Sequence, residues 1–292
     1  IGSYVTRQCL EKGWKVYGVD NCTYAANREF LAEFCANPHF TFCNEDIATL
    51  DYLPDCDYVI NIAAESHVGN SIIDSTDFIE TNVVGVRNLL DLVRHKAHNV
   101  SDRPVFFHFS TDEVYGDITE GEHMETDLLK PSNPYSASKA AADMLILAWA
   151  RTYGIKYIIL RPTNNYGMKL LMRGKKIKLH NEGIPIRNWL HADDTAGAVI
   201  ALIESDTVNE IYNVAGTFEQ KNIDTVTRIC ECYFGEKRDW SPYLDLSHVR
   251  EGQDVRYALN DSKLRQLGWA AQKEFNQEIQ PIVEYYKNNF KW

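Results

Sequence analysis

The sequence predicts an α/β protein built on a doubly wound parallel sheet, with a smaller C-terminal substrate-binding domain. Three observations lead to this prediction. Apolar runs such as residues 57–64 and 105–109 are typical of strands buried on both faces. Amphipathic helical patterns alternate with such runs, as in the units of a parallel sheet. Polar residues follow the strands, where ligands of open α/β sheets bind.

Composition bounds the class of protein. The 292 residues suffice for one large or two modest domains, and a net charge of −11 argues against a nucleic-acid partner. No apolar run is long enough to span a membrane, and no signal peptide is visible. The seven cysteines are scattered without a CxxC pair, which predicts reduced thiols. We therefore expect a cytoplasmic protein with no membrane, nucleic-acid or metal partner.

The first elements indicate a dinucleotide site. Gly2 begins an amphipathic helix that ends near Gly13, and a strand at residues 14–19 leads to Asp20. This order is typical of the second half of a dinucleotide-binding unit, in which an acidic residue accepts hydrogen bonds from the adenosine ribose and favours NAD. We interpret Gly2 as the last glycine of a GxxGxxG fingerprint that begins outside the given sequence. An ordinary turn aspartate remains the alternative for Asp20.

Further strands and a long helix follow. Residues 40–43 form a predicted strand, and the strand at 57–64 ends in Ala63 and Ala64, where a backbone can approach a cofactor closely. Residues 76–96 form a predicted helix with an apolar stripe that belongs either to the core or to a dimer surface. The stripe consists of Ile79, Val83, Val86, Leu90 and Val93.

The segment around which the chain is organised begins with the strand at residues 105–109. Thr111, Asp112 and Glu113 follow it, so one hydroxyl and two carboxyl groups are expected at the carboxyl end of a strand. Two adjacent carboxyls whose pKa values are driven apart can divide acid and base roles. The alternative is that they are polar residues of a surface turn.

A tyrosine and a lysine share one face of the next predicted helix. This helix is expected to start with a Ser or Asn cap and a proline and to run to about Tyr153, with Gly154 ending it, and Tyr135 and Lys139 lie at i and i+4 within it. A tyrosine that acts as a base near pH 7 needs its pKa lowered by about 3 units, or roughly 4 kcal/mol. A nearby ammonium and an oxidised nicotinamide favour the phenolate. An ordinary surface pair is the alternative.

The remaining chain continues the α/β pattern. Asp193 and Asp194 are expected in the first turn of a helix, as capping residues rather than metal ligands. The other predicted elements are a strand at 156–160, short strands within 175–190 around a turn at 181–183, a helix from 191 to about 205, a strand at 211–214, a helix from Asn222 and a helical segment at 264–292.

The motifs STDEVYGD at residues 110–117 and PYSASKAAAD at 134–143 resemble the extended short-chain dehydrogenase/reductase superfamily, and within it the nucleoside-diphosphate-glucose 4,6-dehydratases. The resemblance implies a Rossmann domain at residues 1–167, to which 192–218 return, and a nucleotide-sugar domain at 168–191 and 219–292. It also implies a cofactor, NAD, and a likeness to homodimers in which two helices per subunit form the interface.

The resemblance assigns roles to residues. The implied catalytic residues are Thr111, Asp112, Glu113, Tyr135 and Lys139. The implied cofactor contacts are Gly2, Asp20, Asp46, Ile47, Ala63, Ala64, Asn82, Tyr135 and Lys139. The implied substrate contacts are Ser66, Asn164, Arg187, Asn222, Arg250 and Gln253.

The implied reaction passes through a 4-keto sugar. Tyr135 takes the C4 hydroxyl proton while NAD takes hydride, and Thr111 orients the same oxygen. Glu113 then removes the C5 proton and Asp112 protonates the C6 hydroxyl, each step contributing about 10²- to 10⁴-fold. Hydride returns to C6, which gives a 4-keto-6-deoxy sugar without net redox change.

Three points remain open in the sequence. The resemblance makes dTDP-glucose the first expectation for the substrate, but Gln253 replaces a histidine that is frequent in the bacterial dTDP-glucose enzymes, so UDP-glucose is the second. The family pattern after Gly167 is shortened, so either the protein has a shortened lid or the given sequence omits a segment there, and we favour the omission. The alternative functions are a nucleotide-sugar 4-epimerase, a UDP-glucuronate decarboxylase and a non-catalytic NAD-sensing scaffold.

Overall fold

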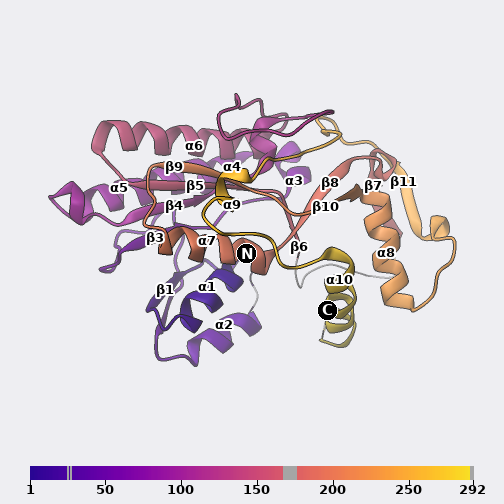
Figure 1. The fold of residues 1–292 in the computed structure, drawn as a ribbon, viewed down its shortest axis with the longest axis horizontal. Coiled ribbons are helices and arrows are strands. Elements are labelled where there is room, and N and C mark those ends of the chain that lie inside the picture. The colour runs from indigo at the N-terminus through magenta and orange to yellow at the C-terminus, as the bar shows by residue number, and fades with distance from the viewer. Residues whose placement is uncertain (25, 27, 167–175, 290–292) are drawn as a thin grey trace.

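The computed structural model describes residues 1–24, 26, 28–166 and 176–289 of the chain. Gly167 and the shortened region that follows it therefore lie outside the described residues. The strands at the centre of the molecule are flanked by helices on two sides, and a second group of strands and helices lies beside them (Figure 1). The architecture is α/β, as predicted.

The central sheet is parallel. It contains β3 (Tyr58–Asn61), β4 (Val105–Phe109), β5 (Tyr157–Pro162) and β9 (Glu210–Val214), in the order β3-β4-β5-β9. These segments are apolar on both sides, so both faces of the sheet are buried.

Two further parallel strands form a separate pair. They are β1 (Val16–Val19) and β2 (Phe40–Cys43), with Val16 opposite Phe40 and Val19 opposite Cys43. No ladder joins this pair to the four-stranded sheet within the described part of the chain. The single parallel sheet expected from the sequence is thus present as two parallel sheets.

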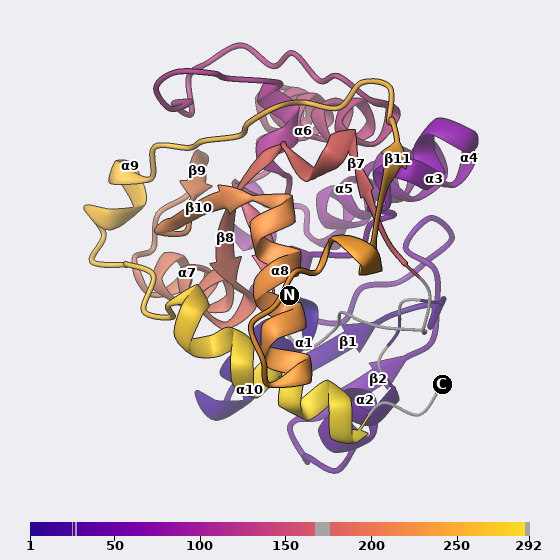
Figure 2. The same ribbon diagram turned by 90° about the vertical axis from the view of Figure 1, so that its right-hand side faces the viewer.

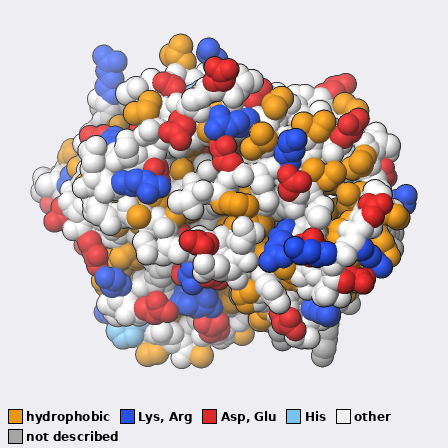
Figure 3. Space-filling view, turned by 45° about the vertical axis from the view of Figure 1, so that its right-hand side comes forward, with side chains coloured by type: hydrophobic (Ala, Val, Ile, Leu, Met, Phe, Trp, Pro, Cys, Tyr) orange, Lys and Arg blue, Asp and Glu red, His pale blue; other side chains and the backbone are white. Residues whose placement is uncertain are grey.

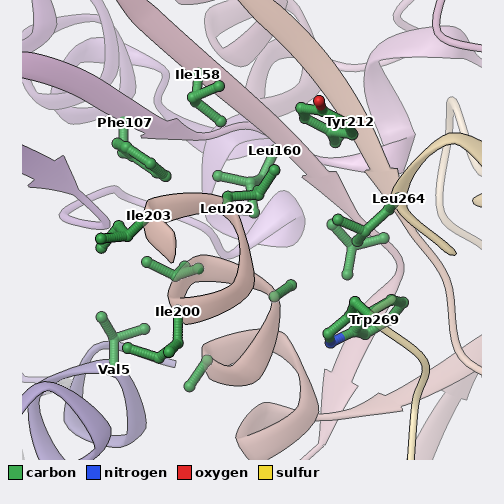
Figure 4. Close-up of a cluster of buried hydrophobic side chains, with 14 of the residues drawn as sticks. Val5, Phe107, Ile158, Leu160, Ile200, Leu202, Ile203, Tyr212, Leu264 and Trp269 are labelled. Carbon is green, nitrogen blue, oxygen red and sulfur yellow. The ribbon is translucent and has the colours of Figure 1, made fainter. Parts of the chain in front are cut away.

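Helices cover both faces of the four-stranded sheet. On one side, α1 (Gly2–Glu11) and α7 (Ala192–Glu204) pack in a cluster with inward side chains of β4 and β5, among them Phe107 and Leu160 (Figure 4). On the other side, α5 (Val86–Lys96) and α6 (Pro134–Tyr153) pack against Phe106 and Ile159. The alternation of side chains along each strand therefore supplies two cores.

The predicted helix at residues 76–96 contains three helical segments. These are α4 (Thr76–Ile79), a π-helical turn (Glu80–Gly85) and α5. Of the apolar stripe, Val86, Leu90 and Val93 are fully buried in the core, whereas Ile79 is 47% exposed. The core interpretation of the stripe is confirmed for these three valine and leucine residues.

The helix that carries Tyr135 begins and ends as predicted. The Asn133 side chain accepts a hydrogen bond from the Ser136 N–H, and the Asn133 N–H donates to the Ser136 hydroxyl. Pro134 occupies the first turn. The helix ends at Gly154, whose φ of 72° is the left-handed conformation that glycine adopts readily. These caps fix the position of the first turn of α6.

The second group of elements lies beyond the carboxyl ends of the central strands. β6 (Asn164–Tyr166), β8 (Ile186–His191) and β10 (Phe218–Lys221) form one sheet, and β7 (Ile177–His180) pairs with β11 (Leu244–His248). The helix α8 (Asn222–Phe234) packs against β10, and α10 (Phe275–Asn289) packs against α8 and β8 (Figure 2). The remaining helices are α2 (Arg28–Cys35), α3 (Val68–Ile73) and α9 (Ser262–Arg265).

Two local predictions were wrong. The segment from 264 onward is not helical between Arg265 and Phe275. Capping by the two acids at the start of α7 is also wrong, because His191 Nδ1 accepts the Asp193 N–H instead. The Asp194 carboxylate accepts the backbone N–H groups of residues 272 and 273, and so fastens the C-terminal segment to α7.

The face of the molecule seen in Figure 3 carries interspersed charges of both signs. Among the described helices, none has the length and apolar character needed to cross a membrane. The described residues also contain no group of three or more His, Cys, Asp or Glu side chains arranged to hold a metal ion. All seven cysteines have free thiols.

Candidate active site

The polar turn after β4 places three side chains at the carboxyl end of the sheet. Thr111 is the N-cap of a short 3₁₀ helix, Asp112–Tyr115, and its hydroxyl accepts the Glu113 N–H at 3.3 Å. The chain leaves this turn at Gly116, whose φ is 83° and where a Cβ would lie 2.4 Å from the Lys130 carbonyl oxygen. The tight turn therefore holds Thr111, Asp112 and Glu113 in a fixed arrangement.

Asp112 is a buried carboxyl group. It is 2% exposed, accepts a hydrogen bond from the Thr111 hydroxyl at 3.0 Å through Oδ1, and has no partner for Oδ2 among the described residues. Burial, and next the charge of Glu113, raise the pKa of Asp112 to about 7. A group with this pKa is a proton donor near neutral pH.

Glu113 lies among cationic and polar groups. Its Oε2 accepts a hydrogen bond from Asn133 Nδ2 at 3.2 Å and lies 3.4 Å from the Tyr257 hydroxyl. Burial raises the pKa of Glu113, while the Asn133 hydrogen bond and the charges of Arg187 and Arg250 oppose this shift. The two carboxyls therefore differ in their partners, as two groups with different roles require.

Tyr135 projects from the first turn of α6 toward this turn. Its side chain is buried, and its ring contacts Phe78 edge-on with centroids 6.3 Å apart. Burial and the charge of Glu113 raise the pKa of Tyr135, and a hydrogen bond with Thr111 lowers it. In the protein without a cofactor, burial and the neighbouring carboxylate therefore dominate the pKa of this phenol, and the effect expected of Lys139 together with an oxidised nicotinamide stays a prediction.

Lys139 lies one turn beyond Tyr135 on the buried face of α6. It is 2% exposed and makes no hydrogen bond with any described residue. Burial lowers the pKa of Lys139 to about 8, and the charge of Asp143 opposes the shift. A buried amine without a hydrogen-bond partner is suited to hold a polar ligand.

The predicted adenosine contacts lie at the carboxyl ends of β1 and β2. Asp20 is exposed, and among the described residues only one of its oxygens accepts a hydrogen bond, from the Cys22 N–H at 2.7 Å. Asp46 accepts hydrogen bonds from Asn21 and from the Ala48 N–H. The Ile47 side chain points into the core instead, where a Cβ on the opposing Gly85 would lie 2.8 Å from it.

The loop after β3 is fixed from the π-helical turn. Asn82 is fully buried, accepts the Glu65 N–H, and donates to the Glu65 carbonyl and the Ser138 hydroxyl, all at 2.9 Å. A single wider turn of this kind is frequent at functional sites. It holds Ala63, which is exposed, and Ala64, which is partly exposed, at the end of the strand.

These observations fit a dinucleotide. Gly2 begins α1, with open space where its Cβ would be, and Ala63 leaves room for close approach at the neighbouring strand end. Among the described residues, one Asp20 carboxylate oxygen has no hydrogen-bond donor and is open to ribose hydroxyls, and the Lys139 amine has N–H donors without an acceptor. The expected cofactor residues thus offer suitable donors, acceptors and space.

The predicted substrate residues come from several segments of the second group of elements. Arg187 on β8 is 6% exposed, and both Arg187 and Arg250 act electrostatically on Glu113. Nδ2 of Asn164 and Nε of Arg250 are buried without a partner among the described residues. The structure therefore brings two arginines near Glu113, and it leaves one donor each of Asn164 and Arg250 unused among the described residues.

The other predicted substrate residues are less constrained. Asn222 begins α8, where its N–H donates to the Pro185 carbonyl at 3.0 Å. Gln253 donates to the Asp254 carbonyl, and Ser66 is exposed in the loop that Asn82 fixes. No described contact joins them directly to the carboxyl pair.

Sequence reasoning missed four residues around Glu113. Asn133 was recognised only as a helix cap, although its amide also binds the glutamate. Ser132, Asp254 and Tyr257 form a hydrogen-bonded group beside it. The position of Asn133 next to Tyr135 was the one available signal, since Tyr257 lies 144 residues from Glu113 in sequence.

Comparisons with known proteins agree with this geometry. Residues 1–282 match the family GDP-mannose 4,6 dehydratase. The chain is 36% identical over 329 residues to a dTDP-glucose 4,6-dehydratase of Escherichia coli, covering 100% of this chain and 91% of the relative. It is 38% identical over 333 residues to the dTDP-glucose 4,6-dehydratase of Neisseria meningitidis serogroup B, covering 100% and 92%.

Solved structures show the same likeness. DesIV, a dTDP-glucose 4,6-dehydratase from Streptomyces venezuelae with NAD and TYD bound, superposes with a TM-score of 0.88 at 34% identity, covering 99% of this chain and 94% of that one. A UDP-glucuronic acid 4-epimerase from Bacillus cereus also gives 0.88, at 22% identity and with coverage of 99% and 96%, which shows a shared fold. The chain therefore belongs to the GDP-mannose 4,6 dehydratase family, within the extended short-chain dehydrogenases/reductases of Rossmann fold.

Proposed function

We propose that the protein is an NAD-dependent hydro-lyase that converts a nucleoside-diphosphate glucose, first of all dTDP-glucose, into the 4-keto-6-deoxy sugar. One observation carries this proposal. A buried acid, Asp112, and a second carboxyl, Glu113, lie beside Tyr135 at the end of β4. Relatives named dTDP-glucose 4,6-dehydratase support the same activity.

The first step is oxidation at C4. NAD, held by residues that include Asp20 and Lys139, would supply the hydride acceptor for C4 and the hydride donor for C6. Tyr135 takes the C4 hydroxyl proton. Thr111, which hydrogen-bonds to the Tyr135 phenol, orients the substrate oxygen. Lys139 lies one turn further along the same buried face of α6, where its amine is available to the cofactor ribose.

The second step is loss of water across C5 and C6. The new C4 ketone acidifies the C5 hydrogen, and Glu113 takes this proton as the base. The C5–H electron pair forms the C5–C6 double bond as the C6–O bond breaks. Asp112, whose pKa is raised to about 7 mainly by burial, protonates the departing hydroxyl, so that water leaves.

The nucleotide diphosphate is assigned to the basic groups near Glu113. Arg187 and Arg250 supply positive charge, and the unused Nδ2 of Asn164 supplies a hydrogen bond. We assign supporting contacts to Asn222, Ser66 and Gln253. The glutamine leaves thymidine and uridine as the two candidate bases.

The alternative functions have no use for Asp112 as a proton donor. An epimerase returns hydride to the opposite face of the sugar and needs no proton donor at C6, and neither does a uronate decarboxylase. A non-catalytic NAD-sensing scaffold has no need for the buried carboxyl of Asp112, which is costly to maintain without a role. The pairing of Asp112 with Glu113 therefore favours the dehydratase.

A product assay tests the proposal. The protein loaded with NAD is incubated separately with dTDP-glucose, UDP-glucose and UDP-glucuronate, and the product is identified by mass spectrometry and by the absorbance that 4-keto sugars develop in base. We expect loss of one water from dTDP-glucose. A galactose epimer, a pentose product or no turnover would each contradict the proposal.

We also infer a cytoplasmic homodimer with two domains. The free thiols of all seven cysteines support a reducing compartment. Exposed apolar side chains on α4 and α6, Ile79 at 47% and Met144 at 49%, support a partner surface on the face of these helices. Residues 1–167 with 192–218 are assigned to NAD, and 168–191 with 219–292 to the nucleotide sugar.

A further inference from the structure

Tyr257 is a buried tyrosine beside the elimination base that the mechanism above does not use. It belongs to the segment after β11, is 1% exposed, and its hydroxyl oxygen lies 3.4 Å from Oε2 of Glu113. Burial raises the pKa of Tyr257, and next the charge of Glu113 raises it further, so the phenol keeps its proton. A neutral phenol is therefore in place next to a carboxylate that must gain and lose a proton.

The phenol hydrogen is committed to a different carboxylate. Tyr257 lies only 2.6 Å from Oδ2 of Asp254, a much shorter contact than the one with Glu113. A phenol has a single O–H hydrogen, so it donates to Asp254 and turns the lone pairs of its oxygen toward Glu113. Protonation of Glu113 would supply the hydrogen that this longer contact lacks.

The group extends to the surface. The Ser132 hydroxyl donates to the same Oδ2 of Asp254, and Ser132 is exposed. Glu113, Tyr257, Asp254 and Ser132 thus form a continuous line of oxygen atoms from the partly exposed Glu113 to the exposed Ser132. Among the described residues, the other hydrogen-bond partner of Glu113 Oε2 is the Asn133 amide, which offers only N–H donors there and cannot carry a proton away.

The surrounding contacts hold this line in place. The Arg187 guanidinium carbon lies 4.3 Å from the centre of the Tyr257 ring, and Arg187 Nη2 donates to the Asp254 carbonyl at 3.2 Å. At Gly252 a Cβ would lie 2.7 Å from the Ser132 carbonyl oxygen, so glycine permits close approach of the two segments. The positions of the phenol and the carboxylate are therefore determined from several sides.

We propose that Tyr257, Asp254 and Ser132 form a proton path between Glu113 and solvent, by which the hydrogen taken from C5 of the sugar is exchanged. The inference rests on the proposed function. The protonated Glu113 donates its hydrogen to the Tyr257 oxygen, the phenol hydrogen passes to Asp254, and Asp254 releases a proton at Ser132. Atoms balance, because one proton leaves Glu113 and one reaches water.

The consequence is a difference in the fate of one hydrogen atom. After hydride returns to C6, C5 must regain a proton. With the path intact, Glu113 exchanges with water and C5 receives a solvent hydrogen. With the path broken, Glu113 keeps the hydrogen that it removed and gives the same atom back. This label distribution distinguishes a proton path from a purely structural role, which changes the rate of turnover but not the origin of the hydrogen.

The test uses dTDP-glucose carrying deuterium at C5, ordinary water and the protein loaded with NAD. We expect the wild-type product to lose the label, and the Tyr257→Phe product to retain several-fold more of it. Asp254→Asn, which preserves side-chain size but cannot take up the proton, is expected to behave like Tyr257→Phe. Tyr212→Phe removes the hydroxyl of another buried tyrosine, on β9, and is expected to match the wild type.

The outcomes separate this inference from the proposed function. Label loss that is equal in the wild type, Tyr257→Phe and Asp254→Asn would overturn the path and leave the dehydratase activity standing. Retention of the label by the wild type would also overturn the path alone. Absence of the dehydrated product from the wild type would overturn the proposed function together with the path. Thermal unfolding of each variant verifies that it is folded, and Asp254→Asn serves where Tyr257→Phe does not fold.

Discussion

Asp143 on α6 and Arg161 on β5 form a fully buried ion pair. Arg161 Nε donates to Asp143 Oδ2 at 3.0 Å, and the side chain of Arg161 is 2% exposed and that of Asp143 0%. Arg161 also donates to the Tyr115 hydroxyl at 2.7 Å, and that hydroxyl lies 2.8 Å from Asn213 Oδ1 on β9. Since Asp143 lies one turn beyond Lys139, the pair ties the catalytic helix to the central sheet.

Replacement of Asp143 by asparagine is expected to lower the free energy of unfolding by about 3–5 kcal/mol, because it leaves the Arg161 charge buried without a counter-charge. Urea unfolding measures the change. The matched control is Glu33→Gln, which breaks the exposed Arg7–Glu33 pair and is expected to cost about 1 kcal/mol or less. Equal losses in the two variants would contradict the prediction.

The pH dependence of stability should report Asp112. Its pKa is raised from 3.8 to about 7, first by burial. Between these values the folded state keeps a proton that the unfolded state has lost, so the stabilisation is complete below the lower pKa and disappears as pH rises through the higher one. The loss is up to about 4 kcal/mol for a shift of about 3 units.

The Asp112→Asn variant is expected to lose this part of the pH dependence. Urea unfolding of both proteins near pH 5 and near pH 8 makes the comparison, over the window in which a raised carboxyl pKa acts. We expect the free energy of unfolding of the variant to approach or exceed that of the wild type at the higher pH. If the free energy of unfolding of the wild type instead rose from pH 5 to pH 8, and the variant lacked this rise, the predicted sign would be wrong.

Glu113→Gln should separate the two chemical steps. The amide cannot take the C5 proton, whereas Tyr135 and Thr111, which serve C4 oxidation, are unchanged. We expect enzyme-bound NADH to form on addition of dTDP-glucose and then to persist, with product formation slowed about 10²- to 10⁴-fold. Stopped-flow absorbance and product analysis measure the two steps.

The comparison variant is Tyr135→Phe, which lacks the phenol that takes the C4 proton. This variant is expected to form NADH at no rate comparable with that of Glu113→Gln, although it still binds the nucleotide sugar. If Glu113→Gln also failed to form NADH, the assignment of the glutamate to elimination alone would be wrong.

Local sequence signals predicted much of the catalytic segment. Tyr135 and Lys139 share a helix face because their spacing is close to one turn, and the Asn133 cap and Gly154 stop define that helix. Thr111, Asp112 and Glu113 lie at a strand end because an apolar run stops immediately before them. Each of these features depends on neighbours within a few residues.

Features that depend on distant segments were not predictable in the same way. The side chain of Ile47 is buried because Gly85, 38 positions later, leaves space for it. The hydrogen bonds of Asn82 depend on a π-helical turn, which a regular helical periodicity does not reveal. The contact between Tyr257 and Glu113 joins two segments 144 residues apart, and only the folded chain shows it.

Alanine substitutions at two glycines with similar backbone conformations distinguish the effect of backbone strain from an effect on function. Gly252 and Gly235 have φ values of 62° and 73°, so alanine at either position is expected to cost about 1–3 kcal/mol in backbone strain. At Gly235, which ends α8, a new Cβ meets nothing within 4 Å. At Gly252 it lies 2.7 Å from the Ser132 carbonyl oxygen, a backbone atom that cannot move aside cheaply.

Gly252→Ala is therefore expected to push the segment that carries Arg250, Asp254 and Tyr257 away from the start of α6. Because Arg250 and Tyr257 both act on Glu113, dTDP binding and the elimination step should weaken together, by about tenfold or more for the loss of a charge-assisted contact. Calorimetric titration with dTDP and single-turnover kinetics measure the two effects. Gly235→Ala, matched for backbone strain, should lose stability and leave both quantities near wild type, and equal functional losses in the two variants would show that strain alone is responsible.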